Sequence, residues 1–130
     1  MNDQVMPDDT MLALRTTAMP ADTNPNGDIF GGWVMAQMDI AGGAAAIKRA
    51  RGRVATVAVD GMSFHRPVFV GDQFSVYTRI ARVGRTSVTV HVEAWVSRGI
   101  GGDPIQVTEG QFTFVAIDGE GRPRPVDGQG

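Results

Sequence analysis

The segment from Gly31 to about Ala50 constrains the fold more than any other part of the chain. It contains no proline, and Gln37 and Asp39 are its only polar residues before Ile47. This composition predicts a helix that is apolar on all sides, and such a helix is either buried or spans a membrane. The segment is short of the about 20 apolar residues that cross a bilayer, and Asp39 lies mid-span, so we expect a buried central helix.

The remainder of the chain is typical of β-structure. A loop rich in turn-forming residues precedes the predicted helix, and short turns separate the segments that follow it. Residues 53–64 form a nearly continuous apolar run, which is typical of a central strand. In residues 84–97 apolar and polar positions alternate, so that Thr89, His91, Glu93 and Trp95 share one face. The expected strands are residues 11–19, 53–64, 72–83, 84–97 and 104–117.

Consecutive strands with short connections predict an antiparallel sheet, and the single helix must cover one face of it. The sequence therefore predicts an α+β fold, in which an antiparallel sheet of about five strands wraps around one long central helix. We expect one domain over residues 11–117, with a flexible N-terminal segment at 1–10. Residues 118–130, rich in Gly and Pro, are expected to form a mostly unpacked, flexible tail.

Composition excludes several functional classes. The chain has no Cys and only two histidines, so thiolate nucleophiles and Cys-ligated zinc are excluded and a catalytic metal site built on histidines is disfavoured. A net charge of -2 without a basic block gives no attraction to nucleic acid. The polar, acidic first ten residues do not resemble a signal peptide, so a cytoplasmic location is expected.

Asp39 is the first candidate for catalysis. A carboxylate in apolar surroundings is costly, but its environment is the one in which general bases and nucleophiles are tuned. The alternative is that Asp39 faces a wet groove or bonds to a nearby amide and does nothing further. Gly31 and Gly32 are the second candidate, because the first N–H groups of a helix lack intrahelical partners and can bind an anion or a polarised carbonyl. Their alternative role is tight packing.

The spacing of these candidates adds a constraint. Gly31 and Asp39 lie eight residues apart, and therefore roughly 12 Å apart along a helix. This is too far for both to act on one carbonyl carbon. If both are catalytic, they come from different chains, with two helices antiparallel and side by side. The catalytic hypothesis therefore requires a dimer.

Two further segments contain candidate residues. Asn24 lies in the loop before the helix. It is a candidate site residue, and the alternative is that it is an ordinary turn residue. Residues 83–87, Val-Gly-Arg-Thr-Ser, form a predicted hairpin turn in which Arg85 is either solvated or binds phosphate together with Thr86 and Ser87. His65 and His91 are expected to have structural roles.

Several motifs in order resemble the short bacterial type of acyl-CoA thioester hydrolase, a hotdog-fold family. The resemblance runs from about Met11 to about Arg124. It rests on the segment from Leu14 to Asp39 and on the shorter motifs GRVATVAVDGMSF, PVFVGD, VGRTSV, VEAWV and FTFVAID. It implies hydrolysis of acyl-CoA thioesters to the free acid and coenzyme A, with no metal or other cofactor. It also implies a homodimer as the minimal unit and further assembly into a hexamer, a trimer of dimers.

The resemblance assigns a role to each candidate. Asp39 corresponds to the catalytic carboxylate, either general base or nucleophile, and Asn24 to a loop asparagine that holds the thioester or the water. Gly31 and Gly32 correspond to the glycines whose amides polarise the thioester carbonyl. Arg85, Thr86 and Ser87 correspond to a segment near the nucleotide end of coenzyme A.

The chain departs from the family pattern in two places. His65 and Arg66 stand where relatives often have an apolar residue and Lys, and the C-terminal tail is shorter than in many relatives. The sequence leaves two other functions to weigh against thioester hydrolysis. A hotdog enoyl-CoA hydratase is disfavoured, because Gly27 occupies the histidine position of its motif. A non-catalytic protein that binds CoA esters is the remaining alternative, and turnover separates it from the enzyme.

Overall fold

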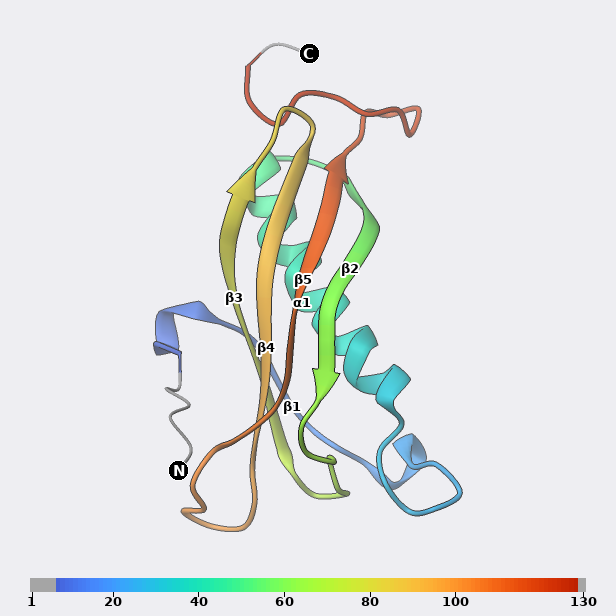
Figure 1. Cartoon of the computed structure of the whole chain (residues 1–130), viewed down its shortest axis with the longest axis vertical. Coiled ribbons are helices and arrows are strands. Elements are labelled where there is room, and N and C mark those ends of the chain that lie inside the picture. The colour runs from blue at the N-terminus through green and yellow to red at the C-terminus, as the bar shows by residue number, and fades with distance from the viewer. Residues whose placement is uncertain (1–6, 129–130) are drawn as a thin grey trace.

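The computed structural model describes residues 7–128 and consists of one long helix against a five-stranded antiparallel sheet (Figure 1). The strand order is β1-β3-β4-β5-β2, and every adjacent pair is antiparallel. Two short 3-10 helices, η1 (Asp9–Met11) and η2 (Pro20–Asp22), flank the first strand. The other elements are β1 (Leu12–Thr17), α1 (Gly31–Ala50), β2 (Val54–Phe64), β3 (Gln73–Val83), β4 (Ser87–Ser97) and β5 (Ile105–Ala116).

The predicted α+β architecture is confirmed. The order of the elements along the chain, one strand, the long helix and then four strands, is also confirmed. The prediction of a central strand at residues 53–64 is wrong, because β2 is an edge strand that pairs with β5 alone. Its apolar side chains are not all buried, since Val57 is 57% exposed and Phe64 is 49% exposed. The apolar run thus marks a strand with uncovered apolar surface.

Helix α1 is buried on one side only. Val34, Met38, Ala41 and Ala46 pack into the core, whereas Ile40 is 59% exposed on the opposite side. The expectation of a helix buried on all sides is therefore wrong for the single chain. Within residues 7–128, no helix is long and apolar enough to cross a membrane.

Gly42 allows close approach of α1 to the sheet. A Cβ atom at Gly42 would lie 3.2 Å from both the Phe114 ring and the Val92 side chain. At Gly43 the nearest atom would be 3.7 Å away, which is an ordinary contact. The small residues in the middle of the helix therefore have unequal packing roles.

We expect Gly42→Leu to destabilise the protein by about 1–3 kcal/mol, because the larger side chain overpacks the helix against Phe114 and Val92. Gly43→Ala is the matched control and is expected to be neutral or to stabilise by up to about 1 kcal/mol through helix propensity. Urea unfolding at a fixed protein concentration measures both. Equal stability of the two variants would contradict the close packing at Gly42.

The segment after β5 folds back over the C-terminal end of α1. Val126 is buried in the core, and Arg124 donates hydrogen bonds to the carbonyl oxygens of Ile117 and of Ala50, the last helical residue. Arg49 forms a two-bonded ion pair with Asp127, and the hydrogen bonds from Arg49 hold the pKa of Asp127 below its usual value. The expectation of an unpacked tail therefore does not hold at Arg124 and Val126, whereas residues 119–123 are exposed.

The described residues include only part of the two terminal segments. Of the N-terminal segment 1–10, residues 1–6 lie outside the described residues, as do residues 129–130 of the tail. Asp9 and Thr10 belong to η1, with the Asp8 carboxylate accepting a hydrogen bond from the Thr10 N–H at 2.9 Å.

Candidate active site

The loop before α1 is held in shape by Asn24. Its Oδ1 atom accepts hydrogen bonds from the backbone N–H groups of Asn26, at 2.9 Å, and Asp28, at 3.1 Å. Its own backbone N–H donates to the carbonyl oxygen of Asp28 at 2.6 Å. Asn24 is therefore a turn residue, as its alternative role predicted, but within residues 7–128 the side-chain NH₂ group has no hydrogen-bond partner and remains available to a ligand.

The helix begins at Gly31 without a side-chain cap. Phe30 occupies the N-cap position, and its carbonyl oxygen accepts from the N–H groups of Trp33 and Val34. The N–H groups of Gly31 and Gly32 make no hydrogen bond to any described residue. Two donors at the positive end of a 20-residue helix are thus available to an oxygen atom that carries partial negative charge.

Packing within the chain does not require glycine at these two positions. A Cβ atom on Gly32 would meet nothing within 4 Å, and one on Gly31 would make an ordinary contact of 3.6 Å with the Phe64 ring. Glycine is the least favourable residue in a helix apart from proline, by about 1 kcal/mol relative to alanine. The tight-packing alternative therefore fails for the isolated chain, and the open space favours close approach of a ligand or a second chain.

Asn24 and Gly31 line one cavity of about 330 Å³. Its apolar wall includes Ile29, Val34 and Val68, all of them buried. Phe64, His65 and Arg66 line the same cavity.

Sequence reasoning did not place the Phe64 to Arg66 segment there, although a signal existed. Only a short turn separates α1 from β2, so β2 runs back along the helix and must end near Gly31.

Asp39 lies apart from this cavity, in the middle of α1. It is half-buried, and its Oδ1 atom accepts a hydrogen bond of 2.7 Å from the Thr56 hydroxyl on β2. In the single chain Asp39 is therefore not a buried carboxylate in apolar surroundings, because it is partly exposed and bonded to a hydroxyl group. Thr56, which the sequence did not reveal as a site residue, orients the carboxylate and leaves Oδ2 without a partner among the described residues.

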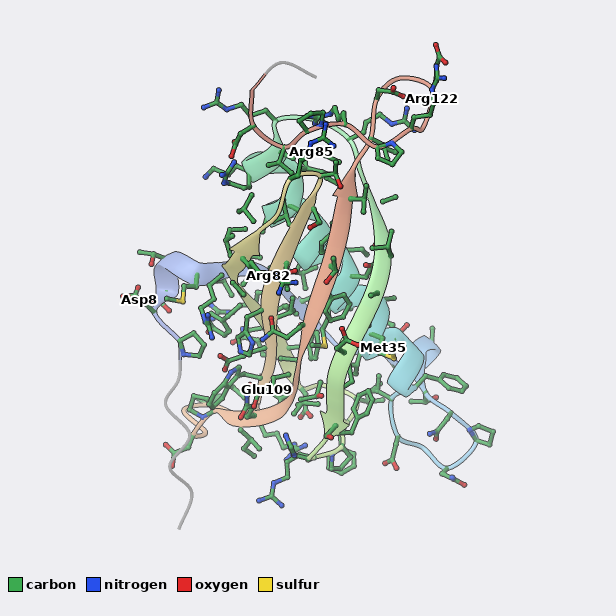
Figure 2. All side chains as sticks on the ribbon, turned by 45° about the horizontal axis from the view of Figure 1, so that its top comes forward. Asp8, Met35, Arg82, Arg85, Glu109 and Arg122 are labelled. Carbon is green, nitrogen blue, oxygen red and sulfur yellow. The ribbon has the colours of Figure 1, made fainter. Side chains whose placement is uncertain are left out.

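The predicted CoA-binding turn lies at the opposite end of the sheet from the Asn24 loop (Figure 2). It is the β3–β4 hairpin, as predicted. Its backbone is fixed, because the carbonyl oxygens of Arg85 and Thr86 accept from Val126 and Ala116. The Arg85 side chain is exposed and makes no ion pair or hydrogen bond with a described residue. The predicted site residues of one chain thus occupy three separate places.

The comparisons with known proteins identify the class to which this fold and site belong. Residues 26–101 match the model of the family described as the thioesterase superfamily, and the chain belongs to this family. It is 54% identical over 119 residues to the acyl-CoA thioester hydrolase YciA of Escherichia coli K12, covering 88% of this chain and 89% of that protein. It is 52% identical to the YciA protein of Salmonella typhimurium, covering 92% of each.

Solved structures agree with this family. HI0827, described as a hexameric broad specificity acyl-coenzyme A thioesterase, has a TM-score of 0.86 and 48% identity over 92% of this chain and 82% of that one. The hexameric thioesterase y2039 of Yersinia pestis has a TM-score of 0.85 and 52% identity over 91% and 96%. The hexameric hotdog fold thioesterase Cj0915 of Campylobacter jejuni has a TM-score of 0.85 and 40% identity over 90% of each chain. The predicted family and hotdog fold are confirmed.

Proposed function

We propose that this chain hydrolyses acyl-CoA thioesters to the carboxylic acid and coenzyme A at a site shared between two copies of the chain. The observation that carries the proposal is the pair of open helix-end amides beside Asn24, combined with a Thr56-bound carboxylate on the same helix. These groups supply what thioester hydrolysis needs, and the relatives named above are acyl-CoA thioester hydrolases over nearly their whole length.

The uncovered surface of the chain supports the sharing of the site. One face of α1 and the edge strand β2 expose apolar side chains next to Asp39 and Gly31. Apolar surface of this kind, beside an unpaired strand edge, is typical of an interface between subunits. A second copy on this face brings its own Asp39 toward the Asn24 loop and helix end of the first. The exposed residues are Met35, Ile40, Ile47, Val57, Val59 and Phe64.

In the proposed mechanism, the N–H groups of Gly31 and Gly32 donate to the thioester carbonyl oxygen and stabilise the negative charge that develops on it. Asp39 of the other chain, oriented by Thr56, takes a proton from a water molecule that attacks the carbonyl carbon, or it attacks the carbon itself and forms a mixed anhydride, which water hydrolyses after the thiolate has left. The C–S bond then breaks, and the thiolate of coenzyme A leaves and takes up a proton. Because a thiolate is a good leaving group, the chemistry needs no strong general acid and no cofactor.

Asn24 is proposed to hold the substrate or the attacking water through its available NH₂ group. Solved structures of the Staphylococcus aureus acyl-CoA hydrolase include one with an asparagine replaced by alanine and another with an aspartate replaced by alanine. The separation of these two residues along that chain equals the separation of Asn24 and Asp39 here. This shared spacing supports the assignment of both residues to one site.

The test of the proposed function is thiol release from a panel of acyl-CoA thioesters of short to long chain length. We expect the wild-type protein to release coenzyme A in repeated turnovers, and the rates across the panel give its preference for chain length. A folded protein that binds CoA esters without releasing thiol would instead support the non-catalytic alternative. Hydration of an enoyl-CoA without thiol release would support the hydratase.

Arg85 is proposed to bind a phosphate at the nucleotide end of coenzyme A, with Thr86 and Ser87 beside it. We expect Arg85→Ala to raise KM for acyl-CoA by about tenfold with little change in kcat, because a remote phosphate contact contributes mainly to uniform binding. Arg122→Ala is the matched control, since Arg122 is an exposed arginine that pairs with Glu120. An unchanged KM in Arg85→Ala would remove this residue from the binding site.

We propose a homodimer as the minimal unit and a hexamer, a trimer of dimers, as the full assembly in the cytoplasm. HI0827, y2039 and Cj0915 are described as hexameric, which supports the larger assembly. Analytical ultracentrifugation tests the proposal directly. A protein that is monomeric while fully active would contradict both the dimer and the shared site.

A further inference from the structure

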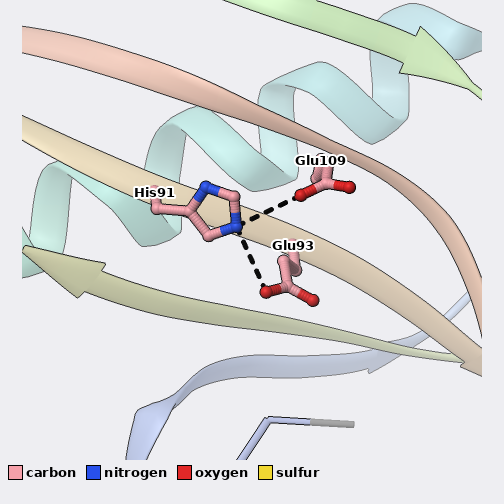
Figure 3. Close-up of side chains that lie close together, drawn as sticks. All are labelled: His91, Glu93 and Glu109. Carbon is pink, nitrogen blue, oxygen red and sulfur yellow. Dashed lines mark hydrogen bonds and ion pairs between the residues drawn. The ribbon is translucent and has the colours of Figure 1, made fainter. Parts of the chain in front are cut away.

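A cluster of polar side chains on the face of the sheet opposite α1 is not used by the proposed mechanism. In the β4–β5 register, His91 pairs with Gln111 and Glu93 pairs with Glu109. These positions alternate with Val90 and Val92, which are fully buried in the core beneath the helix. Figure 3 shows the His91 ring pointing toward both carboxylates. The register thus gathers one imidazole and two carboxylates at one point on this face.

The three side chains have the geometry of a set of metal ligands. The His91 Nε2 atom lies 3.2 Å from Glu93 Oε2 and 3.3 Å from Glu109 Oε1 (Figure 3). Their ligand atoms all lie within 4.8 Å of one another. Ligands about 2.1 Å from a common ion are separated by about 3.0 Å in octahedral and about 3.4 Å in tetrahedral geometry. Both observed separations fall between these values, and a single N–H group cannot point directly at both carboxylate oxygens at once.

Surrounding residues hold two of the three ligands in place. Glu93 Oε1 accepts hydrogen bonds from the Trp95 ring N–H, at 3.1 Å, and the Gln106 amide, at 3.3 Å, so that Oε2 faces His91. Gln111 contacts His91 Nδ1 through its amide at 2.9 Å. Such outer contacts orient metal ligands and tune them.

The Gln111 amide is compatible with the tautomer of His91 that binds a metal ion. Its Oε1 atom is the one buried side-chain nitrogen or oxygen atom in the described part of the chain that lacks a hydrogen-bond partner. Turning the amide by 180° places this oxygen against Nδ1, where it accepts a hydrogen bond if Nδ1 carries the proton, and moves the NH₂ group to the buried position instead. A neutral ring with its proton on Nδ1 has a free lone pair on Nε2, which is the form that binds a metal ion.

Charge balance favours the same conclusion. Glu93 and Glu109 are like charges directly opposite each other on neighbouring strands, an arrangement that destabilises a sheet unless a cation intervenes. Arg79, the β3 neighbour of His91, makes no ion pair with either carboxylate in residues 7–128. A protonated His91 neutralises one of the two negative charges, whereas a divalent ion on a neutral His91 neutralises both.

We propose that His91, Glu93 and Glu109 bind a divalent transition-metal ion of the Zn²⁺ or Mn²⁺ type. Nitrogen and carboxylate ligands suit these ions, and no thiolate is needed. His91 is 8% exposed and Glu109 has a side chain that is 44% exposed, so the ion has fixed protein ligands on one side and open positions toward the surface. Because the cluster lies across the sheet from α1, the ion fastens β4 to β5 and takes no part in the thioester chemistry.

Calorimetric titration of the metal-stripped, assembled protein with Zn²⁺, and separately with Mn²⁺, tests the proposal. We expect one ion per chain, with affinity lowered roughly 10–100-fold in Gln111→Leu and by at least as much in Glu109→Gln. Glu120→Gln, which removes an exposed carboxylate outside the cluster, is the matched control and is expected to bind as the wild type does.

Two further measurements on the wild-type protein do not depend on the folding of a variant. Co²⁺ bound to the wild type is expected to give a d–d absorption spectrum that Zn²⁺ abolishes, and thermal unfolding is expected to shift upward with Zn²⁺ in the wild type but not in Glu109→Gln. Absence of stoichiometric binding in the wild type would overturn the proposal in favour of a protonated His91, and so would equal binding by Glu109→Gln and Glu120→Gln. Neither result depends on thioesterase activity.

Discussion

Replacement of Asp39 by asparagine is expected to lower kcat for acyl-CoA hydrolysis by about a hundredfold or more, with KM changed much less. The amide keeps the size of the side chain, and its oxygen can still accept the hydrogen bond from Thr56. It has no basic or nucleophilic oxygen for the reaction. Measurement of thiol release under saturating substrate separates this loss of chemistry from a loss of binding.

Two companion variants show whether the effect belongs to the site. Asp60→Asn removes an exposed carboxylate of β2 and is expected to leave the rate unchanged. Thr56→Val retains Asp39 but removes its 2.7 Å hydrogen bond, and we expect a smaller loss of about tenfold because the carboxylate is less well oriented. If Asp39→Asn and Asp60→Asn had the same rate as the wild type, Asp39 would have no catalytic role.

Local patterns were sufficient to predict the secondary structure. The proline-free segment from Gly31 to Ala50 is one helix, and the alternation in residues 84–97 identifies the two faces of β4. The position of β2 in the sheet could not be obtained in the same way. An apolar run is expected both from a central strand and from an edge strand whose outer surface meets another chain, so residues 53–64 were placed wrongly.

The packing of Arg124 and Val126 in the tail was missed for a related reason. Its Gly and Pro content is typical of an unpacked segment, but composition does not show that Val126 fills a gap in the core or that Arg124 binds the carbonyl oxygen of Ala50. A few specific contacts outweigh the average character of the segment.

The candidate site was predicted in part. Gly31 and Asp39 were selected because amides at a helix end and a carboxylate in an apolar helix are chemically unusual, whereas the role of Asn24 came from the family resemblance. Thr56 was not selected, because its contact with Asp39 depends on how β2 runs alongside α1, and this is set by the fold and not by local sequence. The separation of Gly31 and Asp39, by contrast, follows from helix geometry alone, and it requires a second chain if both residues are catalytic.

Site sharing makes a specific prediction for mixed assemblies. Asn24→Ala and Asp39→Asn chains are each expected to be nearly inactive alone, yet co-expression of the two in equal amounts should restore about one quarter of the wild-type activity. Half of the dimers formed at random contain one chain of each kind. In each such dimer one site has both substitutions and the other has neither, so one site of the two is intact.

The complementary mixture separates this arrangement from a site within one chain. Co-expression of wild type with the double variant Asn24→Ala/Asp39→Asn places one substitution in every site of a mixed dimer, so only wild-type dimers act and about one quarter of the activity remains. A site within one chain would instead retain about one half here and give no rescue in the first mixture. Both mixtures contain the same two substitutions in equal amounts. Equal activity of about one quarter in the two mixtures therefore shows that Asn24 and Asp39 of one site come from different chains, whereas no activity in the first and about one half in the second shows that they come from the same chain.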